Sequence, residues 1–352
     1  MRALSIAIAL LLAYARGFTL DARGWPSTDD AVAEARYATN TYRARNGSLE
    51  FVHVHKCAGT TVNLHVSALL CAGRPDDVAT PGDHRAVGEA CANVQTPVAD
   101  RETVAAWRRT PCRLVRPHPV DARRSLALIA ETYGAAPRFV SAHEEWSAFE
   151  IPWRPETTYK AVVVRSPYAW WKSNLLYACR CKDRPPAYGR LWTMAQALRT
   201  RDAERASQAL RNRVAQTALP RALVEELERG AAGAPAATRR VLASYAFVGT
   251  VERLDASLCL LARTFLSGPG ACALCCAHSA GATPHHNAGA DDACAAAANF
   301  SGGDEAAFVA RHAADGAVYD VAAAVLDARL AAAAREDWGG VGASCACDVV
   351  VE

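Results

Sequence analysis

The stretch LEFVHVHKCAGTT, residues 49–61, combines a short β-rich run with a lysine, small residues and two threonines. Leu49 to His55 is rich in residues that favour a strand, and Lys56 to Thr60 predicts a tight turn. The following segment, Thr61 to Leu70, carries apolar residues at helical spacing. The order strand, turn, helix is typical of an α/β unit.

Two later stretches repeat this strand-to-helix order. Thr158 to Val164 predicts a strand, and it is followed by Pro167 and a helical stretch from Tyr168 to Tyr177. Ser244 to Val251 is again strand-like and leads into Leu254 to Leu266, whose apolar residues share one helical face. Strands that alternate with helices predict the α/β class with a central, mostly parallel sheet. Ligands of such sheets bind at the C-terminal ends of the strands.

The rest of the chain carries weaker signals. We expect helix over 196–230, a loop from Gly230 to Pro235 directly after it, and a second helical stretch over Glu305 to Trp338. With 51% hydrophobic and 21% charged residues the chain has the composition of a folded globular protein. Its net charge of +3 is too small to suggest nucleic-acid binding.

The N-terminus has the pattern of a signal peptide. Arg2 precedes a mostly apolar run from Ala3 to Ala15, which is shorter than the roughly 20 residues of a membrane span. A short signal anchor is the alternative, and it would be the only attachment to a membrane. The expected organisation is a signal peptide at residues 1–17, a stem or N-terminal arm at 18–48, a folded domain at 49–338 and a Cys-containing tail at 339–352.

The 13 cysteines fit the secretory pathway, where most would form disulfides and at least one stays unpaired. Cys57 is the candidate free thiol. It lies in the turn from Lys56 to Thr60, and if this turn binds an anion it would lower the pKa of the thiol. The Cys- and His-bearing stretch 272–294 is better explained by disulfides than by zinc, so no metal is expected. Sequons at Asn46 and Asn299 are compatible with a glycoprotein of the Golgi lumen or a secreted one.

The turn after the first strand has the chemistry of a phosphate cradle. Small residues let backbone N–H groups approach an anion, the helix start adds partial positive charge, and Lys56 adds a full charge. The lysine precedes Gly59, so the pattern is not the GxxxxGK[ST] of ordinary P-loop nucleotide hydrolases.

The segment HVHKCAGTT resembles the phosphosulfate-binding loop of the Golgi carbohydrate sulfotransferases, whose usual form is a strand, a His and then Lys-Thr-Gly-Gly-Thr. Cys57 and Ala58 replace the usual Thr and Gly. The segment VVVRSPYAWWKS resembles the same family's 3′-phosphate motif, with Arg165, Pro167 and Ser173 at matching positions. Ser166 replaces a common Asp there, and Trp170 replaces a common second Arg.

Two further segments resemble the family in the same order along the chain. YAFVGTVERLDASLCLLARTF is similar to the strand, glycine turn and helix that border the adenosine end, with Gly249 and Glu252 in matching places. VYDVAAAVLDARL is similar to the family's closing helix, with Tyr319 and Asp320 matching. SAHEEWSAF most resembles the heparan sulfate 6-O-sulfotransferases.

The resemblance implies a three-layer, P-loop-like sulfotransferase fold and the co-substrate 3′-phosphoadenosine 5′-phosphosulfate (PAPS). It implies that His143 is the general base, with Glu144 and Glu145 as rivals, and that Lys56 stabilises the leaving oxygen. The implied PAPS-binding residues are Lys56, Cys57, Ala58, Gly59, Thr60, Thr61, Arg165 and Ser173.

The implied acceptor is a carbohydrate hydroxyl on a heparan-like glycan, another polysaccharide or a glycoprotein sugar, and a tyrosine side chain is the alternative. Aromatic and cationic residues suit an acceptor cleft, and the candidates for it are Trp146, Trp170, Trp171 and Lys172. Core packing is the better explanation for at least one of the three tryptophans. A nucleotide-dependent kinase and a non-catalytic glycan-binding protein of the same fold are the alternative functions. The oligomeric state stays open.

Overall fold

The computed structural model describes a set of separate ranges: residues 48–59, 61–62, 114–115, 139–142, 158–180, 208, 210–265 and 302–335. The predicted signal peptide, nearly all of the stem, the Cys- and His-bearing stretch and the C-terminal tail lie outside these ranges. No helix within the described ranges is both long enough and apolar enough to cross a membrane.

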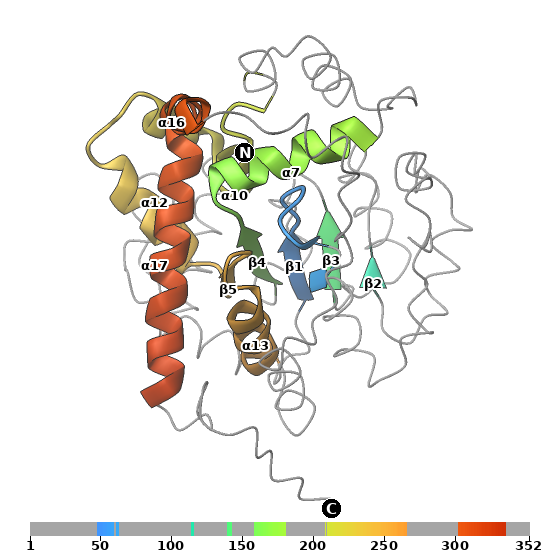
Figure 1. Ribbon diagram of the computed structural model, residues 1–352. Coiled ribbons are helices and arrows are strands. Elements are labelled where there is room, and N and C mark those ends of the chain that lie inside the picture. The colour runs from blue at the N-terminus through green and yellow to red at the C-terminus, as the bar shows by residue number, and fades with distance from the viewer. Residues whose placement is uncertain are drawn as a thin grey trace, which may run out of the picture.

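A parallel sheet forms the centre of the described structure (Figure 1). Its strands are β1 (Ser48–Val52), β2 (Leu114–Val115), β3 (Phe139–Ala142), β4 (Thr158–Val164) and β5 (Phe247–Thr250). Their order is β2-β3-β1-β4-β5, and every neighbouring pair is parallel. The α/β class with a parallel sheet is therefore confirmed.

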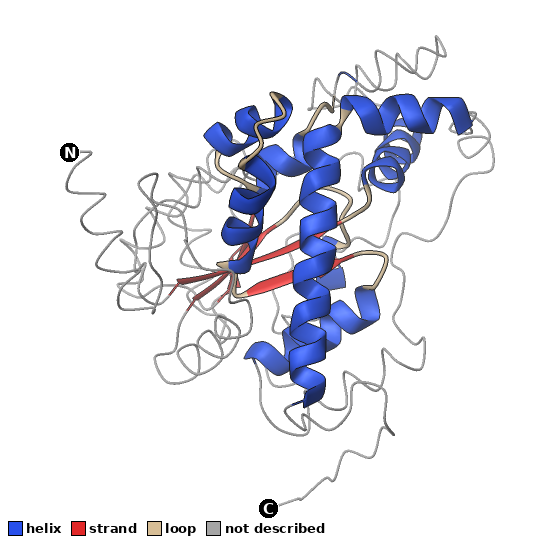
Figure 2. Cartoon of the chain, turned by 90° about the vertical axis from the view of Figure 1, so that its left-hand side faces the viewer, coloured by secondary structure: helices blue, strands red, loops and turns tan. Residues whose placement is uncertain are grey.

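Both ends of seven helices are described along the chain, and all seven lie after β4. They are α7 (Pro167–Arg180), α10 (Arg213–Ala218), α11 (Arg221–Glu228), α12 (Ala234–Ala243), α13 (Leu254–Phe265), α16 (Gly302–Arg311) and α17 (Ala313–Arg335). Figure 2 shows the long α17 running beside the sheet. It packs against β5, α10, α11, α12 and α13.

The sheet buries apolar side chains on both faces, because successive strand residues point to opposite sides. Val162 and Val164 belong to a cluster with residues of α7, α10, α11, α12 and α17. Ala161 and Val163 belong to a second cluster, which includes residues of α13 and the last turns of α17. Burial of side chains such as these stabilises the fold by about 1.5–3 kcal/mol each.

The helical region around residue 220 differs from the single predicted helix over 196–230. Pro220 cannot continue α10, and Leu219 before it is extended (φ −129°, ψ 156°). Helix α11 ends at Glu228, and Gly230 turns the chain away with a φ of 68° that suits glycine, while the Ala231 N–H donates to the Glu226 carbonyl at 3.0 Å. Helix α12 then begins within the predicted loop.

The long helix expected from Glu305 to Trp338 is broken at His312. His312 and Asp315 are fully buried, and the Asp315 carboxylate accepts the backbone N–H of Ala215 at 2.8 Å. The carboxylate therefore caps the start of α10. Helix propensity within residues 302–335 does not predict this contact, because α10 is distant in the sequence.

The sheet order places the topological switch point between the C-terminal ends of β1 and β4. From β1 the chain proceeds toward β2 at one edge of the sheet, whereas from β4 it proceeds to β5 at the other edge. The connections after β1 and β4 therefore diverge, which makes this the point where ligands of open parallel sheets bind. Helix α7 crosses this end of the sheet (Figure 1).

Candidate functional site

The segment after β1 forms a loop with two left-handed residues. Lys56 has a φ of 62° and Ala58 a φ of 56°, and the Cys57 N–H donates to the Val54 carbonyl at 3.1 Å. A helix begins at Gly59, with the Val62 N–H donating to the Ala58 carbonyl at 2.9 Å. Alternating backbone conformations of this kind turn N–H groups toward one concavity and suit an anion.

This loop begins earlier than the sequence predicts, because β1 ends at Val52 and not at His55. His53 and His55 therefore lie in the loop. Thr61 lies in the first turn of the helix and is buried, whereas Thr60 lies outside the described residues.

Gly59 is required because the His53 ring occupies the place of a side chain. A Cβ on Gly59 would lie 1.6 Å from His53 Nε2, and the ring is itself stacked on Phe51 at 5.6 Å between centroids. The imidazole would have to leave its position to admit even one methyl group.

We expect Gly59→Ala to lower the free energy of unfolding by about 1–3 kcal/mol in urea denaturation, through this overpacking. Gly233→Ala is the matched control, since a Cβ there meets nothing within 4 Å. Adding His53→Ala to Gly59→Ala should recover part of the loss. An equal loss in the single and the double variant would show that the His53 ring is not the obstacle.

Cys57 connects the loop to the end of β4. Its side chain is fully buried and its thiol is free. The backbone N–H of Arg165 donates to Cys57 Sγ, but burial is the larger effect and raises the pKa of the thiol well above 9.0. The prediction that the loop lowers this pKa is wrong, because Cys57 packs beneath the loop and not in its concavity. The group is a thiol at neutral pH.

Arg165 and Ser166 follow β4 directly and lie beside the loop. Arg165 is half-buried, and its Nε atom is buried and has no hydrogen-bond partner in the described part of the chain. The Ser166 N–H donates to Glu252 Oε1 at 2.9 Å. A buried guanidinium N–H without an acceptor is costly in a folded protein, so Arg165 is equipped to receive an anion.

Glu252 also connects this region to α17. The Tyr319 hydroxyl donates to the Glu252 carboxylate, and the pKa of Tyr319 is raised, first by burial and then by the charge of Glu252. Gly249 does not lie in the predicted turn but in β5, where a Cβ would approach Ser257 Cβ to 2.8 Å. It allows α13 to pack closely against β5.

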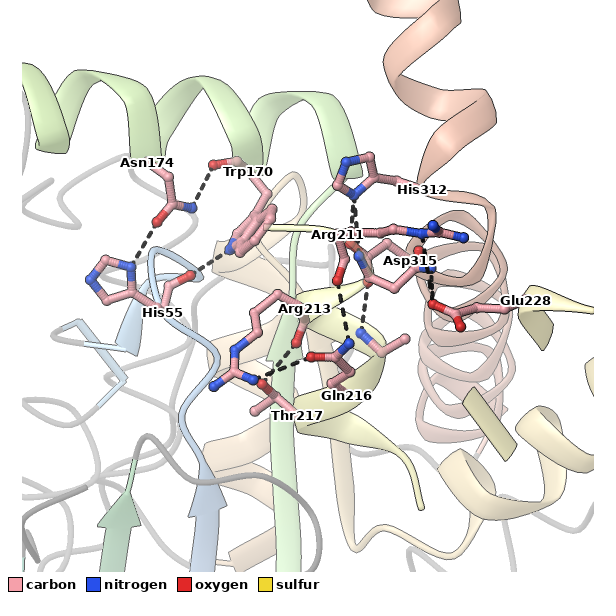
Figure 3. Close-up of polar contacts among 12 residues, drawn as sticks. His55, Trp170, Asn174, Arg211, Arg213, Gln216, Thr217, Glu228, His312 and Asp315 are labelled. Carbon is pink, nitrogen blue, oxygen red and sulfur yellow. Dashed lines mark hydrogen bonds and ion pairs between the residues drawn. The ribbon is translucent and has the colours of Figure 1, made fainter. Parts of the chain in front are cut away.

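One face of α7 holds the loop (Figure 3). Trp170 Nε1 donates to the His55 carbonyl at 2.6 Å, and His55 Nδ1 lies 2.8 Å from Asn174 Oδ1. Asn174 Nδ2 donates to the Trp170 carbonyl at 2.9 Å. The ammonium group of Lys56 lies 4.4 Å from the centroid of the Tyr177 ring. Ser173 is half-buried and, by helical spacing, lies at the edge of this face.

The two adjacent tryptophans of α7 do not line an acceptor cleft. Trp170 and Trp171 are each 1% exposed, and the Trp171 ring stacks on Phe308 at 4.8 Å between centroids. Lys172 lies over the Tyr168 ring, with Nζ 4.7 Å from its centroid. The acceptor-cleft hypothesis is therefore wrong for both tryptophans.

The predicted base lies outside the described residues, together with Glu144, Glu145 and Trp146. Strand β3 ends at Ala142, the residue before His143, and Ala142 pairs with Val52, the last residue of β1. Across the described ranges, no group of three or more His, Cys, Asp or Glu is placed to hold a metal ion.

Several residues that shape the site were not among those predicted from the sequence. Asn174 and the contact of Trp170 with the loop were missed, although a buried asparagine within an aromatic helix is a usable signal. The pair His312 and Asp315 was also missed (Figure 3). Its residues are distant from α10 in sequence and meet it only in the fold.

Comparison of the chain with protein-family models, with curated proteins and with solved structures found no match.

Proposed function

We propose that this protein is a PAPS-dependent sulfotransferase that transfers the sulfuryl group to a carbohydrate hydroxyl. The observation that carries the proposal is that the four sequence segments meet at one edge of the sheet. The Arg165 N–H reaches Cys57, the Ser166 N–H reaches Glu252, and Tyr319 reaches Glu252. Residues separated by up to 262 positions (57 to 319) are thereby joined around the ends of β1, β4 and β5.

The described residues fit an anionic nucleotide with phosphate groups at both ends. The left-handed loop, the helix start at Gly59 and Lys56 would hold the 5′-phosphosulfate. Arg165, with its unpartnered Nε, and Ser173 would hold the 3′-phosphate. Two separate positive centres favour a ligand with two separated anionic groups over one with a single diphosphate.

In this proposal PAPS supplies an activated sulfuryl group that an acceptor hydroxyl attacks. Lys56 would neutralise the charge that develops on the departing phosphate oxygen, and the backbone N–H groups of the loop would orient it. His143 would accept the proton of the acceptor hydroxyl. The buried thiol of Cys57 takes no part in the transfer, because its raised pKa keeps it protonated. The mechanism requires no metal ion.

The finer fold that we propose for residues 49–338 is the three-layer, P-loop-like sulfotransferase fold. Helices on both faces of the parallel sheet support it. We also propose a secretory-pathway location, in the Golgi lumen or outside the cell. The disulfide bond of Cys259 supports this location, because disulfides persist in oxidising compartments.

Calorimetric titration with 3′-phosphoadenosine 5′-phosphate (PAP), the product left after transfer, tests the proposal without knowledge of the acceptor. We expect PAP to bind about a hundredfold more tightly than adenosine diphosphate, because PAP carries at the 3′ position, where Arg165 would receive it, the second phosphate that adenosine diphosphate carries on its 5′ chain. Equal binding of the two nucleotides would instead favour a kinase. Folded protein that binds neither would overturn the nucleotide site and favour glycan binding.

A further inference from the structure

Lys56 is held in a conformation that lysine does not prefer. Its φ of 62° lies in the left-handed region, where the Cβ of any residue other than glycine is crowded. Such a conformation persists only where the surroundings impose it, and strained residues of this kind collect at binding sites. The neighbouring contacts of the loop must therefore supply the restraint.

The restraint comes first from Trp170. Its indole N–H donates to the His55 carbonyl at 2.6 Å, and that carbonyl shares a rigid peptide plane with the Lys56 N–H. Fixing the carbonyl fixes the orientation of the plane from which Lys56 projects. The indole is 1% exposed, so water does not compete for the carbonyl at this contact.

Asn174 supplies the second restraint and sets the proton position on His55. Because Asn174 Nδ2 donates to the Trp170 carbonyl, its Oδ1 is the atom that faces His55 Nδ1 as an acceptor. His55 Nδ1 therefore carries a proton and donates. Asn174 thus holds the ring of His55, and Trp170 holds its carbonyl group.

A third contact acts on Lys56 itself. Trp170, Asn174 and Tyr177 recur at intervals of four and three residues, so they share one face of α7. The Tyr177 ring lies beneath the ammonium group at 4.4 Å. Helix α7 begins two residues after Arg165 and also carries Ser173. Both halves of the anion site are therefore anchored on the same helix.

We propose that Trp170 and Asn174 are positioning residues that hold His55 and so set the direction of Lys56 toward the bound nucleotide. The inference rests on the proposed function.

The first test needs no ligand. Hydrogen–deuterium exchange of the folded protein should show at least about tenfold faster exchange at the Val54 and Cys57 amides in Trp170→Phe, with β5 unchanged. Trp171→Phe is the matched control, because Trp171 is equally buried on the same helix but packs on Tyr168 and Phe308. Unchanged exchange in Trp170→Phe, or equal acceleration in both variants, would overturn the proposal.

The second test is a double-mutant cycle on PAP affinity. Trp170→Phe should weaken PAP binding about tenfold in the wild-type background but less than about threefold in a Lys56→Ala background, because its effect passes through Lys56. Equal losses in both backgrounds would contradict the inference. Failure of the wild type to bind PAP would instead overturn the proposed function, and the exchange result would still stand.

A second pair of variants carries the test if Trp170→Phe does not fold. Asn174→Asp keeps an acceptor for His55 Nδ1–H, whereas Asn174→Leu removes it at similar volume. We expect the exchange of Val54 and Cys57 to accelerate in Asn174→Leu and to stay within about threefold of the wild type in Asn174→Asp. The same exchange rate in both variants would contradict a role for the hydrogen bond.

Discussion

Arg165→Ala is expected to weaken PAP binding by about a hundredfold or more while leaving the fold intact. Removing the guanidinium deprives the 3′-phosphate of a charged partner, a loss of about 2–5 kcal/mol in comparable charge pairs. The backbone N–H that donates to Cys57 Sγ is retained in alanine. The Nε atom has no hydrogen-bond partner among the residues that the structure describes, so its removal breaks no hydrogen bond there.

Calorimetry with PAP and adenosine diphosphate on both proteins measures this effect. Adenosine diphosphate should bind Arg165→Ala nearly as well as the wild type, because it lacks the 3′-phosphate. Arg221→Ala is the control, since its side chain is 91% exposed and pairs along α11 with Glu225. An Arg165→Ala protein that loses both nucleotides equally would show that Arg165 acts on the whole site and not on the 3′-phosphate.

Asp315→Ala is expected to be the most destabilising single substitution that we propose, at about 3 kcal/mol or more. The carboxylate accepts the N–H groups of Val214 and Ala215 at the start of α10 and contacts His312 Nδ1 at 3.4 Å. Alanine would remove the acceptor of the buried Val214 and Ala215 N–H groups. The melting temperature and the free energy of unfolding in urea measure the loss.

Asp315→Asn and Asp320→Ala are the controls for this substitution. Asparagine keeps an oxygen for the Ala215 N–H, so it should cost less than half as much as alanine. Asp320 is an exposed residue of the same helix, and its removal should change stability by no more than about 0.5 kcal/mol. Losses of similar size for Asp315→Asn and Asp315→Ala would contradict the capping role of the carboxyl oxygen.

The pH dependence of Asp315 has a definite sign. Burial is the main cause that raises its pKa above the ordinary value of 3.8. The folded protein therefore keeps this proton over a range of pH in which the unfolded chain has lost it. The stability that Asp315 contributes is complete below about pH 3.8 and declines as the pH rises through the folded pKa. In Asp315→Asn this decline should be absent.

Local sequence patterns are sufficient for β4 and for the helix after β5. Strand β4 has the predicted bounds, Thr158 to Val164, because its run of three valines ends there and Pro167, three residues on, starts a helix. The helix after β5 likewise begins at the predicted Leu254. Residues adjacent in sequence decide these elements.

Other features depend on contacts between distant residues and could not be read from the sequence. The break at His312 follows from Asp315 capping α10, a hundred residues away, and the loop conformation depends on Trp170 and Asn174. The position of Cys57 beneath the loop reversed the expected direction of its pKa shift. Where tertiary packing holds a site, the sequence can identify candidate site residues, but it does not show which side chains contact them.

The contact between Glu252 and Tyr319 has a consequence for biosynthesis. A chain emerging from the ribosome exposes β1, β4 and α7 long before residue 319 has been made. The early segments must therefore wait for α17, which supplies both the Tyr319 hydroxyl and the Asp315 cap of α10. A nascent chain truncated before α17 should accordingly stay bound to chaperones, and release should coincide with translation of that last helix.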